Sequence, residues 1–496
     1  MKEKLLCLSV LVMTLLIAGI APTTASAAEV NPTVTGPITG GCSPSCPTPP
    51  GPPNGIHVPE AFLGVSNEAP FQAADYTEEE FFFSGTATAF ERDPSAPAWT
   101  SSGNWTAIPS TTIAPAAYES RMLVRRPTDP TKFNGIVVVE WLNVTAQIDL
   151  APDYGYYQTE LLRDGYIWVG VSVQSVGVNG SLLLGGNFGL KAWDPVRYGS
   201  LNVNPSDNYS YDIYSQAAQA IRHPAGVNPL GSSAYVIKGI LADGESQSAG
   251  RMVTYFDAIQ PLAQVFDGFL IHSTGMTGSG LFAGAGGGVP SPSFLRTDQQ
   301  PALVFETETD TVGYFNARQA NSATYRLWEG TGTAHVDSYD LATFMADPDN
   351  QEPSYPANAC TFEDNTAHER YLMNAALFHL SQWINGGPLP PTAPPIDVVS
   401  GVIQRDSLGI ALDGIRLPEM DVPTLTQQGV GNSGTAFCIL FGRTLPLPVT
   451  LSSLYRNHGK YVSEFAHATN ALESAGFILD PDAEEAKTDA GESGVP

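Results

Sequence analysis

The sequence predicts an α/β fold in which helices cover both faces of a mostly parallel sheet. Apolar, β-branched runs such as Gly135–Trp141 (GIVVVEW) and Tyr166–Val173 (YIWVGVSV) are typical of strands buried on both faces. Helix-forming segments separate these runs, as the connections between parallel strands require. Of the 496 residues, 43% are hydrophobic, which is enough for a large core. We therefore expect one large globular body.

The expected elements alternate along the chain. Strands are predicted where apolar and β-branched residues gather, at Glu79–Phe90, Tyr118–Arg125, Gly135–Trp141, Tyr166–Val173, Tyr235–Leu241, Gly268–His272, Ala302–Phe305 and Thr324–Trp328. Helices are predicted between them, at Asp153–Arg163, Tyr211–Ile221 and Arg251–Phe256. Catalytic groups in such sheets gather beyond the carboxyl ends of the strands. The residues that follow each strand are therefore the first place to look for chemistry.

The first residues have the pattern of a cleavable signal peptide, expected over residues 1–27. Lys2 and Lys4 precede an apolar run from Leu5 to Ala21, and Ala25-Ser26-Ala27 supplies the small residues of a cleavage site. A transmembrane anchor is the alternative, but no basic stop-transfer cluster follows the run. No later stretch is long and apolar enough to span a bilayer. We expect a secreted or periplasmic protein with no membrane span in its mature form.

Composition divides the rest of the chain into three parts. Residues 28–56 are expected to be a Pro/Gly-rich linker, because prolines between Pro44 and Pro53 fix φ and remove hydrogen-bond donors. Neither helix nor sheet should persist there. Residues 57–480 are expected to form one folded domain, with a candidate cap at residues 175–215. Residues 481–496 form an acidic tail that we expect to be frayed, at least beyond its first turn.

Charge and cysteine content limit the partners. With 23 basic and 50 acidic residues the net charge is 23 − 50 = −27, which repels a phosphate backbone, so no nucleic-acid partner is expected. After removal of the signal, four cysteines remain in an oxidising compartment. Of the three pairings we favour Cys42 with Cys46 and Cys360 with Cys438. No metal site is expected, because neither a second close cysteine pair nor a His-x-x-His motif is present. No nucleotide-binding fingerprint calls for a cofactor, and the oligomeric state stays open.

The candidate nucleophile is Ser246. The segment Gly244-Glu245-Ser246-Gln247-Ser248 follows a predicted strand and precedes a predicted helix. A strand, a tight turn with serine at its tip and a helix form a nucleophile elbow, in which crowding favours small residues two positions on either side of the serine. Gly244 fits this rule, and Ser248 replaces the second glycine of G-x-S-x-G. The string alone is weak evidence, because a chain with 48 glycines contains such strings by chance.

The candidate acid and base follow later strands. A serine hydroxyl needs a base that an acid orients, and in this architecture the chain order is serine, acid, histidine. Asp310 lies five residues past the strand end at Phe305, and His335 lies in a glycine-bearing loop after Trp328. Glu308 is the alternative acid. The alternative is that these residues belong to an ordinary acidic loop and a surface histidine. It would require that three strand ends carry a suitable residue by coincidence. We expect the other histidines, including His272 at a strand end, to be structural, except that the role of His57, beside the linker, stays open.

Acyl transfer also needs two N–H donors for the oxyanion of the tetrahedral intermediate. The amide of Gln247, which follows the nucleophile, is the first candidate. The second should come from the loop after the strand that ends at Trp141, where Asn143 or Val144 is a positional guess.

Together these residues resemble a known family, the α/β-hydrolase-domain proteins of largely unassigned substrate, which bacteria often export. The similar segments span nearly all of the folded domain, at Val137–Thr145, Asp243–Tyr255, Thr307–Asp310, Trp328–Asp337 and Arg405–Pro423. The resemblance implies an α/β-hydrolase fold, with Ser246 as nucleophile, His335 as base and Asp310 or Glu308 as acid. It implies no substrate, and the role of Arg405–Pro423 stays open.

Three functions are compatible with these features. The first is a serine hydrolase that cleaves carboxylic esters of small molecules or polymers through an acyl-enzyme. The second is an acyltransferase or polyester hydrolase with the same residues, in which apolar side chains of the candidate cap line an acyl pocket: Leu182, Leu183, Leu184, Phe188, Trp193 and Tyr198. A buried cap core would explain these side chains equally well. The third is a non-catalytic exported binding protein with this fold.

Overall fold

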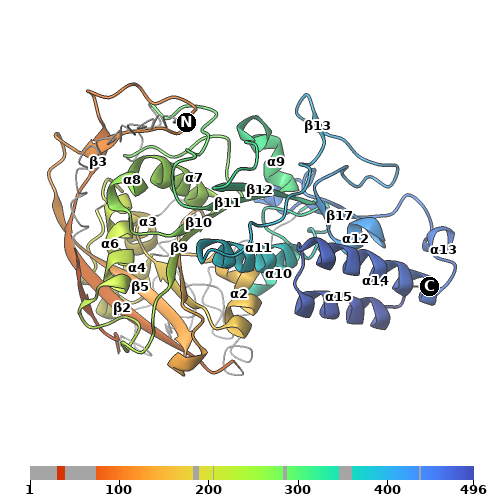
Figure 1. Cartoon of the computed structure of the whole chain (residues 1–496), viewed down its shortest axis with the longest axis horizontal. Helices are drawn as coiled ribbons and strands as arrows, with labels where there is room; N and C mark the ends of the chain where they lie inside the picture. Colours follow the sequence, from red (N-terminus) through yellow and green to blue (C-terminus); the bar gives the residue numbers. More distant parts are fainter. Residues whose placement is uncertain are drawn as a thin grey trace, which may run out of the picture.

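The computed structural model describes residues 31–39, 74–181, 189–204, 206–282, 288–345, 360–434 and 437–495. Within them the main sheet has eleven strands in the order β15-β12-β11-β10-β9-β6-β7-β5-β2-β1-β8 (Figure 1). The predicted signal peptide, most of the predicted linker and the predicted Cys42–Cys46 pair lie outside the described residues. None of the described helices combines the length and the apolar composition that crossing a membrane requires.

The centre of the sheet is parallel and completely buried, as predicted. Its strands are β6 (Ile136–Trp141), β7 (Ile167–Val171), β9 (Gly239–Glu245), β10 (Gly268–His272), β11 (Ala302–Thr307) and β12 (Tyr325–Thr331). Within this group, adjacent strands pair in parallel. In β6, Val137 and Val139 pack into the core on one face, and Ile136 and Val138 pack into the core on the other. Alternate side chains of a strand point to opposite faces, so this strand is apolar on both of them. The exception is the buried Glu140, which accepts a hydrogen bond from Trp168 Nε1 at 2.9 Å.

The other side of the sheet is mostly antiparallel and includes part of the expected linker. Strand β2 (Tyr76–Ala87) pairs with β5 (Ala116–Pro127) over its whole length, and β5 pairs with β7. Strand β1 (Thr33–Thr35) pairs with β2, so the expectation that no sheet persists in residues 28–56 is wrong for this segment. The segment TVT precedes the proline cluster and is β-branched, and the Val34 side chain is only 1% exposed.

Strand β9 differs from its predicted position. It begins at Gly239 and ends at Glu245, whereas we expected Tyr235–Leu241. Tyr235 lies before the strand, and its hydroxyl donates a hydrogen bond to the carbonyl oxygen of Pro127 at 2.6 Å. Residues 235–237 have the composition of a strand but serve to anchor the connection to β5. The shift places the carboxyl end of β9 directly before Ser246.

Helices cover both faces of the sheet (Figure 1). Helix α6 (Ser210–Arg222) and helix α7 (Gln247–Thr254) contribute to the core on one face. Helix α2 (Pro152–Asp164) and helix α11 (Glu369–Ile384) contribute to the core on the other. The predicted helices at Asp153–Arg163 and Tyr211–Ile221 are thus present.

Several shorter elements complete the described chain. The short helices are α8 (Gln260–Ala263), α9 (Glu308–Tyr314), α10 (Ser338–Met345), α12 (Pro418–Asp421) and α13 (Leu451–Leu454). The short strands are β3 (Phe90–Arg92), β4 (Ala107–Pro109), β8 (Ala225–Gly226), β13 (Val398–Val399), β14 (Val402–Ile403), β15 (Ile415–Arg416), β16 (Leu425–Gln428) and β17 (Arg443–Pro446).

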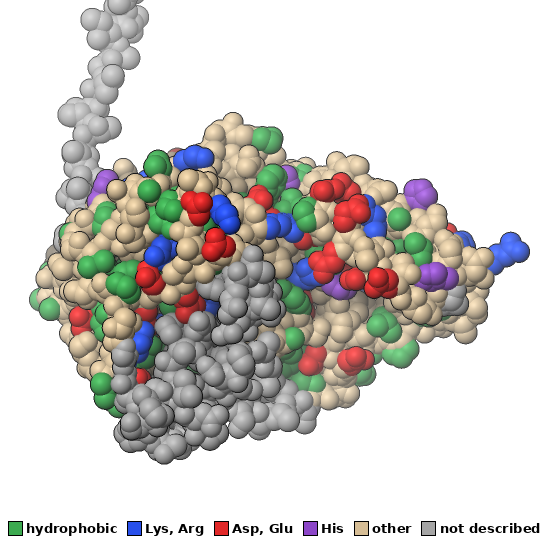
Figure 2. All heavy atoms as spheres, turned by 90° about the horizontal axis from the view of Figure 1, so that it is seen from below, with side chains coloured by type: hydrophobic (Ala, Val, Ile, Leu, Met, Phe, Trp, Pro, Cys, Tyr) green, Lys and Arg blue, Asp and Glu red, His purple; other side chains and the backbone are tan. Residues whose placement is uncertain are grey.

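The acidic C-terminal segment is helical, which corrects the expectation of a frayed tail. Helix α15 (Asp480–Glu492) packs against α14 (His458–Ala475). Its alanines at positions 483, 486 and 490 are buried, a spacing that places them on one face of the helix. Asp482 accepts two hydrogen bonds from Arg163, at 2.7 and 2.9 Å. Acidic side chains gather on the surface of this half of the molecule (Figure 2), and the buried alanine face shows why a high acidic content did not prevent folding.

The candidate cap begins with helices α3 (Ser175–Asn179), α4 (Leu190–Trp193) and α5 (Pro195–Tyr198). Tyr198 is fully buried, and its hydroxyl donates to Glu80 Oε1 on β2 at 3.0 Å. Arg197 forms an ion pair with the same carboxylate at 2.6 Å. Tyr198 is therefore part of a buried cluster beside β2. Of the other residues suggested for an acyl pocket, Leu182–Leu184 and Phe188 lie outside the described residues.

Candidate active site

The turn between β9 and α7 has the geometry of a nucleophile elbow. Ser246 has φ 57° and ψ −115°, a conformation rare for a residue other than glycine. Its N–H donates to the carbonyl oxygen of His272 at 2.9 Å, which ties the turn to β10. A Cβ atom at Gly244 would lie 3.1 Å from Ser248 Cβ and 3.3 Å from Met252 Cγ. The crowding predicted from the sequence is thus present, and serine is tolerated at position 248.

Ser246, His335 and Asp310 lie in hydrogen-bond contact with one another. Ser246 Oγ is 2.9 Å from His335 Nε2. His335 Nδ1 is 2.9 Å from Asp310 Oδ1 and 3.0 Å from Asp310 Oδ2. The three residues follow β9, β12 and β11, so the carboxyl ends of three parallel strands bring them together. This line of contacts can carry a proton from the hydroxyl to the imidazole while the carboxylate orients the ring.

Local hydrogen bonds hold Asp310 and His335 in place. Thr307 caps the start of α9, and its hydroxyl donates to Asp310 Oδ2 at 2.5 Å. The backbone N–H of His335 donates to Thr309 Oγ1 at 3.1 Å. The next residue, Val336, donates to the carbonyl oxygen of Leu440 at 3.2 Å. The loop that carries His335 begins at Gly332, directly after β12, and we call it the histidine loop. Hydrogen bonds therefore fix it to α9 on one side and to the segment after Phe437 on the other.

Glu308, the alternative acid, has other partners. Its Oε2 accepts from the N–H of Gly332 at 2.9 Å, and its Oε1 accepts from the N–H of Gly429 at 3.0 Å. Arg405 Nη2 donates to the same Oε1 at 2.5 Å. Of the two carboxylates considered from the sequence, only Asp310 contacts His335. Glu308 instead anchors the beginning of the loop that carries the histidine.

The segment Arg405–Pro423, whose role the sequence left open, supports the same loop. Strand β15 extends the sheet by pairing Ile415 with Gly330 on β12. Gly332 has φ +77°, and a Cβ there would lie 2.5 Å from Met420 Sδ. Arg405 adds its ion pair with Glu308, described above. The segment therefore packs along the end of β12, where the histidine loop begins.

The charges around His335 favour its protonated form. Burial alone would lower the pKa of His335, but the carboxylates of Asp310 and Glu245 outweigh it and raise the pKa well above 6.5. For Asp310, burial would raise the pKa, and the nearby His335 charge and hydrogen bonds lower it below 3.8. The Asp310 carboxyl thus favours its ionised form, and the His335 ring loses its proton at a higher pH than an ordinary histidine.

Glu245 and Asn143 form a pair that the sequence analysis did not foresee. Glu245 Oε1 lies 2.9 Å from His335 Nε2. Asn143 Nδ2 donates to Glu245 Oε2 at 2.9 Å and to the carbonyl oxygen of Glu245 at 3.1 Å. The only sequence signal for this contact is that Glu245 directly precedes the candidate nucleophile Ser246.

The backbone N–H groups suggested as oxyanion donors differ in whether another acceptor already uses them. The backbone N–H of Asn143 donates to the carbonyl oxygen of Leu150 at 2.8 Å, so it is already in use. Val144 is thereby the candidate that stays in this loop. Gln247 is the first residue of α7, where an N–H has no acceptor within its own helix.

A second buried histidine lies behind the elbow. His272 Nδ1 is 2.7 Å from Asp153 Oδ1, and His272 Nε2 is 3.0 Å from Glu369 Oε1. Burial raises the pKa of Glu369 to about 8. Both ring nitrogens are thus occupied by side chains of α2 and α11, which agrees with the expectation that His272 is structural. Over the described ranges, no group of three or more His, Cys, Asp or Glu side chains is arranged to hold a metal ion.

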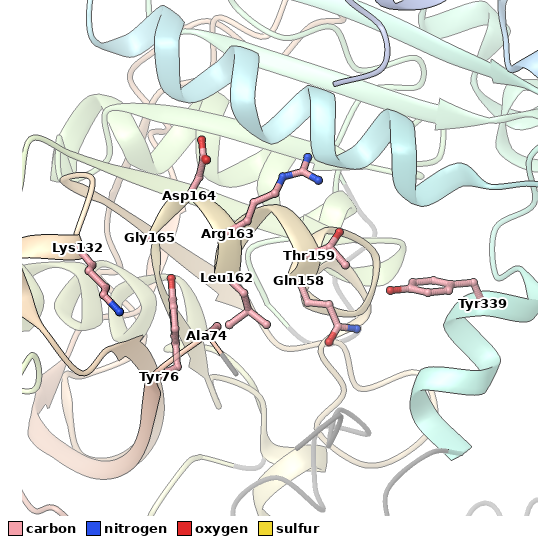
Figure 3. A pocket seen from close by; sticks show the side chains of 10 residues that line it. All are labelled: Ala74, Tyr76, Lys132, Gln158, Thr159, Leu162, Arg163, Asp164, Gly165 and Tyr339. Carbon is pink, nitrogen blue, oxygen red and sulfur yellow. The ribbon is translucent and has the colours of Figure 1, made fainter. Parts of the chain in front are cut away.

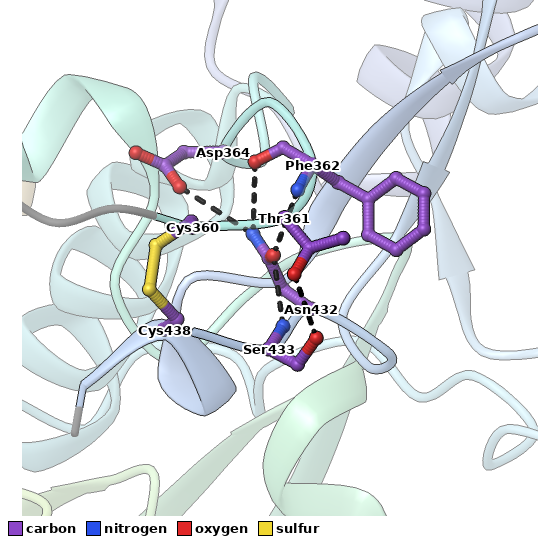
Figure 4. Close-up of a disulfide and its surroundings, with 7 residues drawn as sticks. All are labelled: Cys360, Thr361, Phe362, Asp364, Asn432, Ser433 and Cys438. Carbon is purple, nitrogen blue, oxygen red and sulfur yellow. Dashed lines mark hydrogen bonds between the residues drawn. A yellow bond between two sulfur atoms is a disulfide. The ribbon is translucent and has the colours of Figure 1, made fainter. Parts of the chain in front are cut away.

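A disulfide lies at the start of the short helical turn Cys438–Leu440 (Figure 4). Cys360 and Cys438 are bonded, with their Cα atoms 5.4 Å apart, and this is one of the two pairs we predicted. Beside it, Thr361 N–H donates to the carbonyl oxygen of Ser433 at 2.7 Å, and Phe362 N–H donates to Asn432 Oδ1 at 3.1 Å. The disulfide joins two loop segments. Cys438 lies two residues before Leu440, whose carbonyl oxygen accepts the hydrogen bond from the N–H of Val336 in the histidine loop.

A cavity of about 860 Å³ lies elsewhere, at the carboxyl end of α2 (Figure 3). Its lining includes Lys132, Arg163 and Tyr339 but none of the residues around Ser246. Tyr76 also lines it, and its hydroxyl donates to the carbonyl oxygens of Leu161 and Tyr166 at 2.7 and 2.8 Å. These bonds join β2 to the last turn of α2 and to the residue before β7.

Comparison with known proteins settles the family. A family model described as an alpha/beta hydrolase domain matches residues 34–488, which is most of the chain. The chain belongs to this alpha/beta hydrolase family. No curated protein matches the sequence.

Solved structures similar to this alpha/beta hydrolase include esterases and serine hydrolases. One of two fungal esterases from Rhizomucor miehei is 12% identical, with 65% of this chain and 89% of that chain covered and a TM-score of 0.32. An α/β serine hydrolase without lid from Xanthomonas campestris is 12% identical, with 46% and 84% covered and a TM-score of 0.29. An α/β serine hydrolase homologue from Coxiella burnetii is 10% identical, with 46% and 88% covered and a TM-score of 0.28.

Proposed function

We propose that this alpha/beta hydrolase cleaves carboxylic esters through an acyl-enzyme, with Ser246 as nucleophile, His335 as base and Asp310 as the acid that orients the base. One observation carries the proposal. It is the unbroken line of contacts from Ser246 Oγ to His335 Nε2, at 2.9 Å, and from His335 Nδ1 to Asp310, at 2.9 Å. A serine at the tip of a strained turn, with a base in hydrogen-bond contact, is the arrangement that acyl transfer needs.

The reaction then proceeds in two halves. His335 Nε2 takes the proton of Ser246 as Oγ attacks the ester carbonyl, and the N–H groups of Gln247 and Val144 receive the oxyanion. The imidazolium gives its proton to the departing alcohol, which leaves the acyl group on Ser246. Water attacks the acyl-enzyme with the same base, and the acid product leaves.

We further propose that the protein is exported. The Cys360–Cys438 disulfide supports this, because such bonds persist in oxidising compartments and are rare in the cytosol. The signal-peptide pattern of residues 1–27 points in the same direction.

Hydrolysis of p-nitrophenyl acetate tests the activity directly. We expect turnover by the protein and none above background by Ser246→Ala, because the nucleophile is lost. Ser248→Ala is the matched control: this hydroxyl is also buried on the elbow, and it contacts neither His335 nor Asp310 in the described contacts. Equal rates for the protein and Ser246→Ala would refute the proposal.

Labelling with a fluorophosphonate separates this proposal from the binding-protein alternative. We expect covalent attachment at Ser246, found by peptide mass spectrometry. A chain that neither reacts with the probe nor hydrolyses a panel of esters of different acyl length would be a binding protein. Release of the acyl group to an added alcohol in preference to water would indicate a transferase.

A further inference from the structure

The carboxylate of Glu245 lies at the same imidazole nitrogen as the candidate nucleophile. Its Oε1 is 2.9 Å from His335 Nε2, and Ser246 Oγ is also 2.9 Å from Nε2. Glu245 is only 4% exposed, and among the described residues its Oε1 has no hydrogen-bond partner. A buried oxygen without a hydrogen bond therefore faces the ring atom that would carry the proton.

Asn143 holds this carboxylate in position. Its Nδ2 donates to Glu245 Oε2 at 2.9 Å, which leaves Oε1 directed at the ring. The amide of Asn143 is itself oriented, because its Oδ1 accepts from the N–H of Thr145 at 2.7 Å and its backbone pairs with Leu150. Side chains held by such bonds do not need to reorganise when charge develops nearby.

We propose that Glu245 is a second catalytic carboxylate, which stabilises the imidazolium form of His335 by direct contact with Nε2. The inference rests on the proposed function. As the bond from Ser246 Oγ to the carbonyl carbon forms, the hydroxyl proton moves to Nε2 and the carbonyl π electrons move to oxygen. Glu245 neither gains nor loses a proton. When the ester C–O bond breaks, the proton on Nε2 passes to the alcohol oxygen.

The contact favours one state of the ring over the other. A neutral imidazole turns the lone pair of Nε2 toward Ser246, and a nearby negative charge does not stabilise it. Once Nε2 carries the proton, the ring is positive and the same charge attracts it. The stabilisation is therefore greater in the tetrahedral intermediate than in the resting state, which is the condition for catalysis.

Three carboxyl groups from different elements face this ring. The carboxylate of Asp310, on α9, contacts Nδ1, and that of Glu245, at the end of β9, contacts Nε2. Glu306, at the end of β11, is the third, but burial and the charges of Asp310 and Glu329 raise its pKa well above 4.5. Glu306 therefore favours its neutral form, and Glu245 is the carboxyl group of these three that contacts Nε2.

The pKa of His335 tests the inference without requiring activity. We would follow the Cε1 signal of histidine-labelled protein by NMR as pH is varied, and assign it by its loss in His335→Gln. Glu245→Gln keeps the shape and removes the charge, so we expect the His335 pKa to fall by about one to three units. Asn143→Ala should lower it in the same direction by less. Glu140→Gln is the matched control, since this buried glutamate hydrogen-bonds Trp168 instead and should leave the pKa unchanged.

An unchanged His335 pKa in Glu245→Gln would overturn the inference, whether or not an ester is hydrolysed. Where turnover is measurable, kcat/KM of Glu245→Gln should begin to rise at a lower pH than that of the native protein, and its plateau at high pH should be lower. A plateau equal to the native one would also overturn the inference, because the charge would then not assist the reaction. Absence of any ester turnover by the native protein would refute only the proposed function.

Discussion

The guanidinium of Arg405 lies 2.5 Å from the carboxylate of Glu308, across 97 positions of the sequence. The same carboxylate accepts the N–H groups of Gly332 and Gly429. The histidine loop begins at Gly332, directly after β12. This ion pair therefore links the segment Arg405–Pro423 to the loop that holds the candidate base, and it gives Arg405 a positioning role.

Arg405→Met should destabilise the protein and reduce its activity. The Glu308 side chain is fully buried, so removing its partner leaves a buried charge unpaired, at a cost of about 3 kcal/mol in the free energy of unfolding. Urea unfolding followed by circular dichroism measures this cost. Asp421→Asn breaks the half-exposed pair with Arg416 in the same segment and should cost less than about 1 kcal/mol. Similar costs for both variants would contradict the positioning role.

Asp310→Asn should mainly reduce kcat, whereas Glu308→Gln should mainly reduce stability. Asp310 contacts the ring, so its amide should reduce kcat by a factor of about 10⁴ while the protein stays folded. Glu308 contacts only backbone N–H groups and Arg405, so its amide should lower stability more than kcat. Ester hydrolysis and thermal unfolding of both variants provide the comparison. A larger loss of kcat in Glu308→Gln would reverse the assignment of the acid.

The position of the site was predictable because it depends on strand ends. Ser246, Asp310 and His335 each follow an apolar run, and parallel strands bring their carboxyl ends to one edge of the sheet. The contact between Glu245 and the ring was not predictable, because it depends on a side-chain rotamer beside the elbow. The choice between Asp310 and Glu308 was also open, since only the turn of α9 decides which carboxylate points at the histidine.

The misplaced boundaries have equally local causes. The segment at Tyr235 has the composition of a strand but lies before β9, held by its bond to Pro127. Strand β1 and helix α15 were missed because the predictions there used the proline content or the acidity of a whole segment, which says nothing about its individual side chains. A single inward valine at position 34, or alanines at 483, 486 and 490, decide the packing of that segment.

Stability should fall as pH rises from about 5 to about 9. Burial raises the pKa of Asp337 to about 7 and of Glu369 to about 8, so the folded protein holds protons that the unfolded chain releases near pH 4. The raised pKa of His335 acts in the same direction above pH 6.5. A state that binds more protons loses relative stability with increasing pH. Urea unfolding across this range measures the slope, which Glu369→Gln should reduce. A flat or rising profile would contradict these pKa values.

Reduction of the Cys360–Cys438 disulfide should loosen the histidine loop. The bond closes a loop with a sequence separation of 78, and loops of that length correspond to about 4 kcal/mol of stability. We expect the Cys360→Ser, Cys438→Ser double variant to unfold at a lower temperature and to lose kcat, because Leu440 holds Val336. Reducing agent should have the same effect on the native protein and none on the double variant. Unchanged kcat in the variant would show that the loop keeps its position without the bridge.

The three-residue strand β1 has a practical consequence for recombinant work. It lies between β2 and β8, and Val34 is opposite Phe83 in the pairing. A shortened gene that starts at the long strand Tyr76–Ala87 would look reasonable, because the preceding stretch is rich in proline. The product would expose the hydrogen-bonding groups of β2 along an unprotected edge, which invites aggregation. Expression should therefore begin upstream of Pro32.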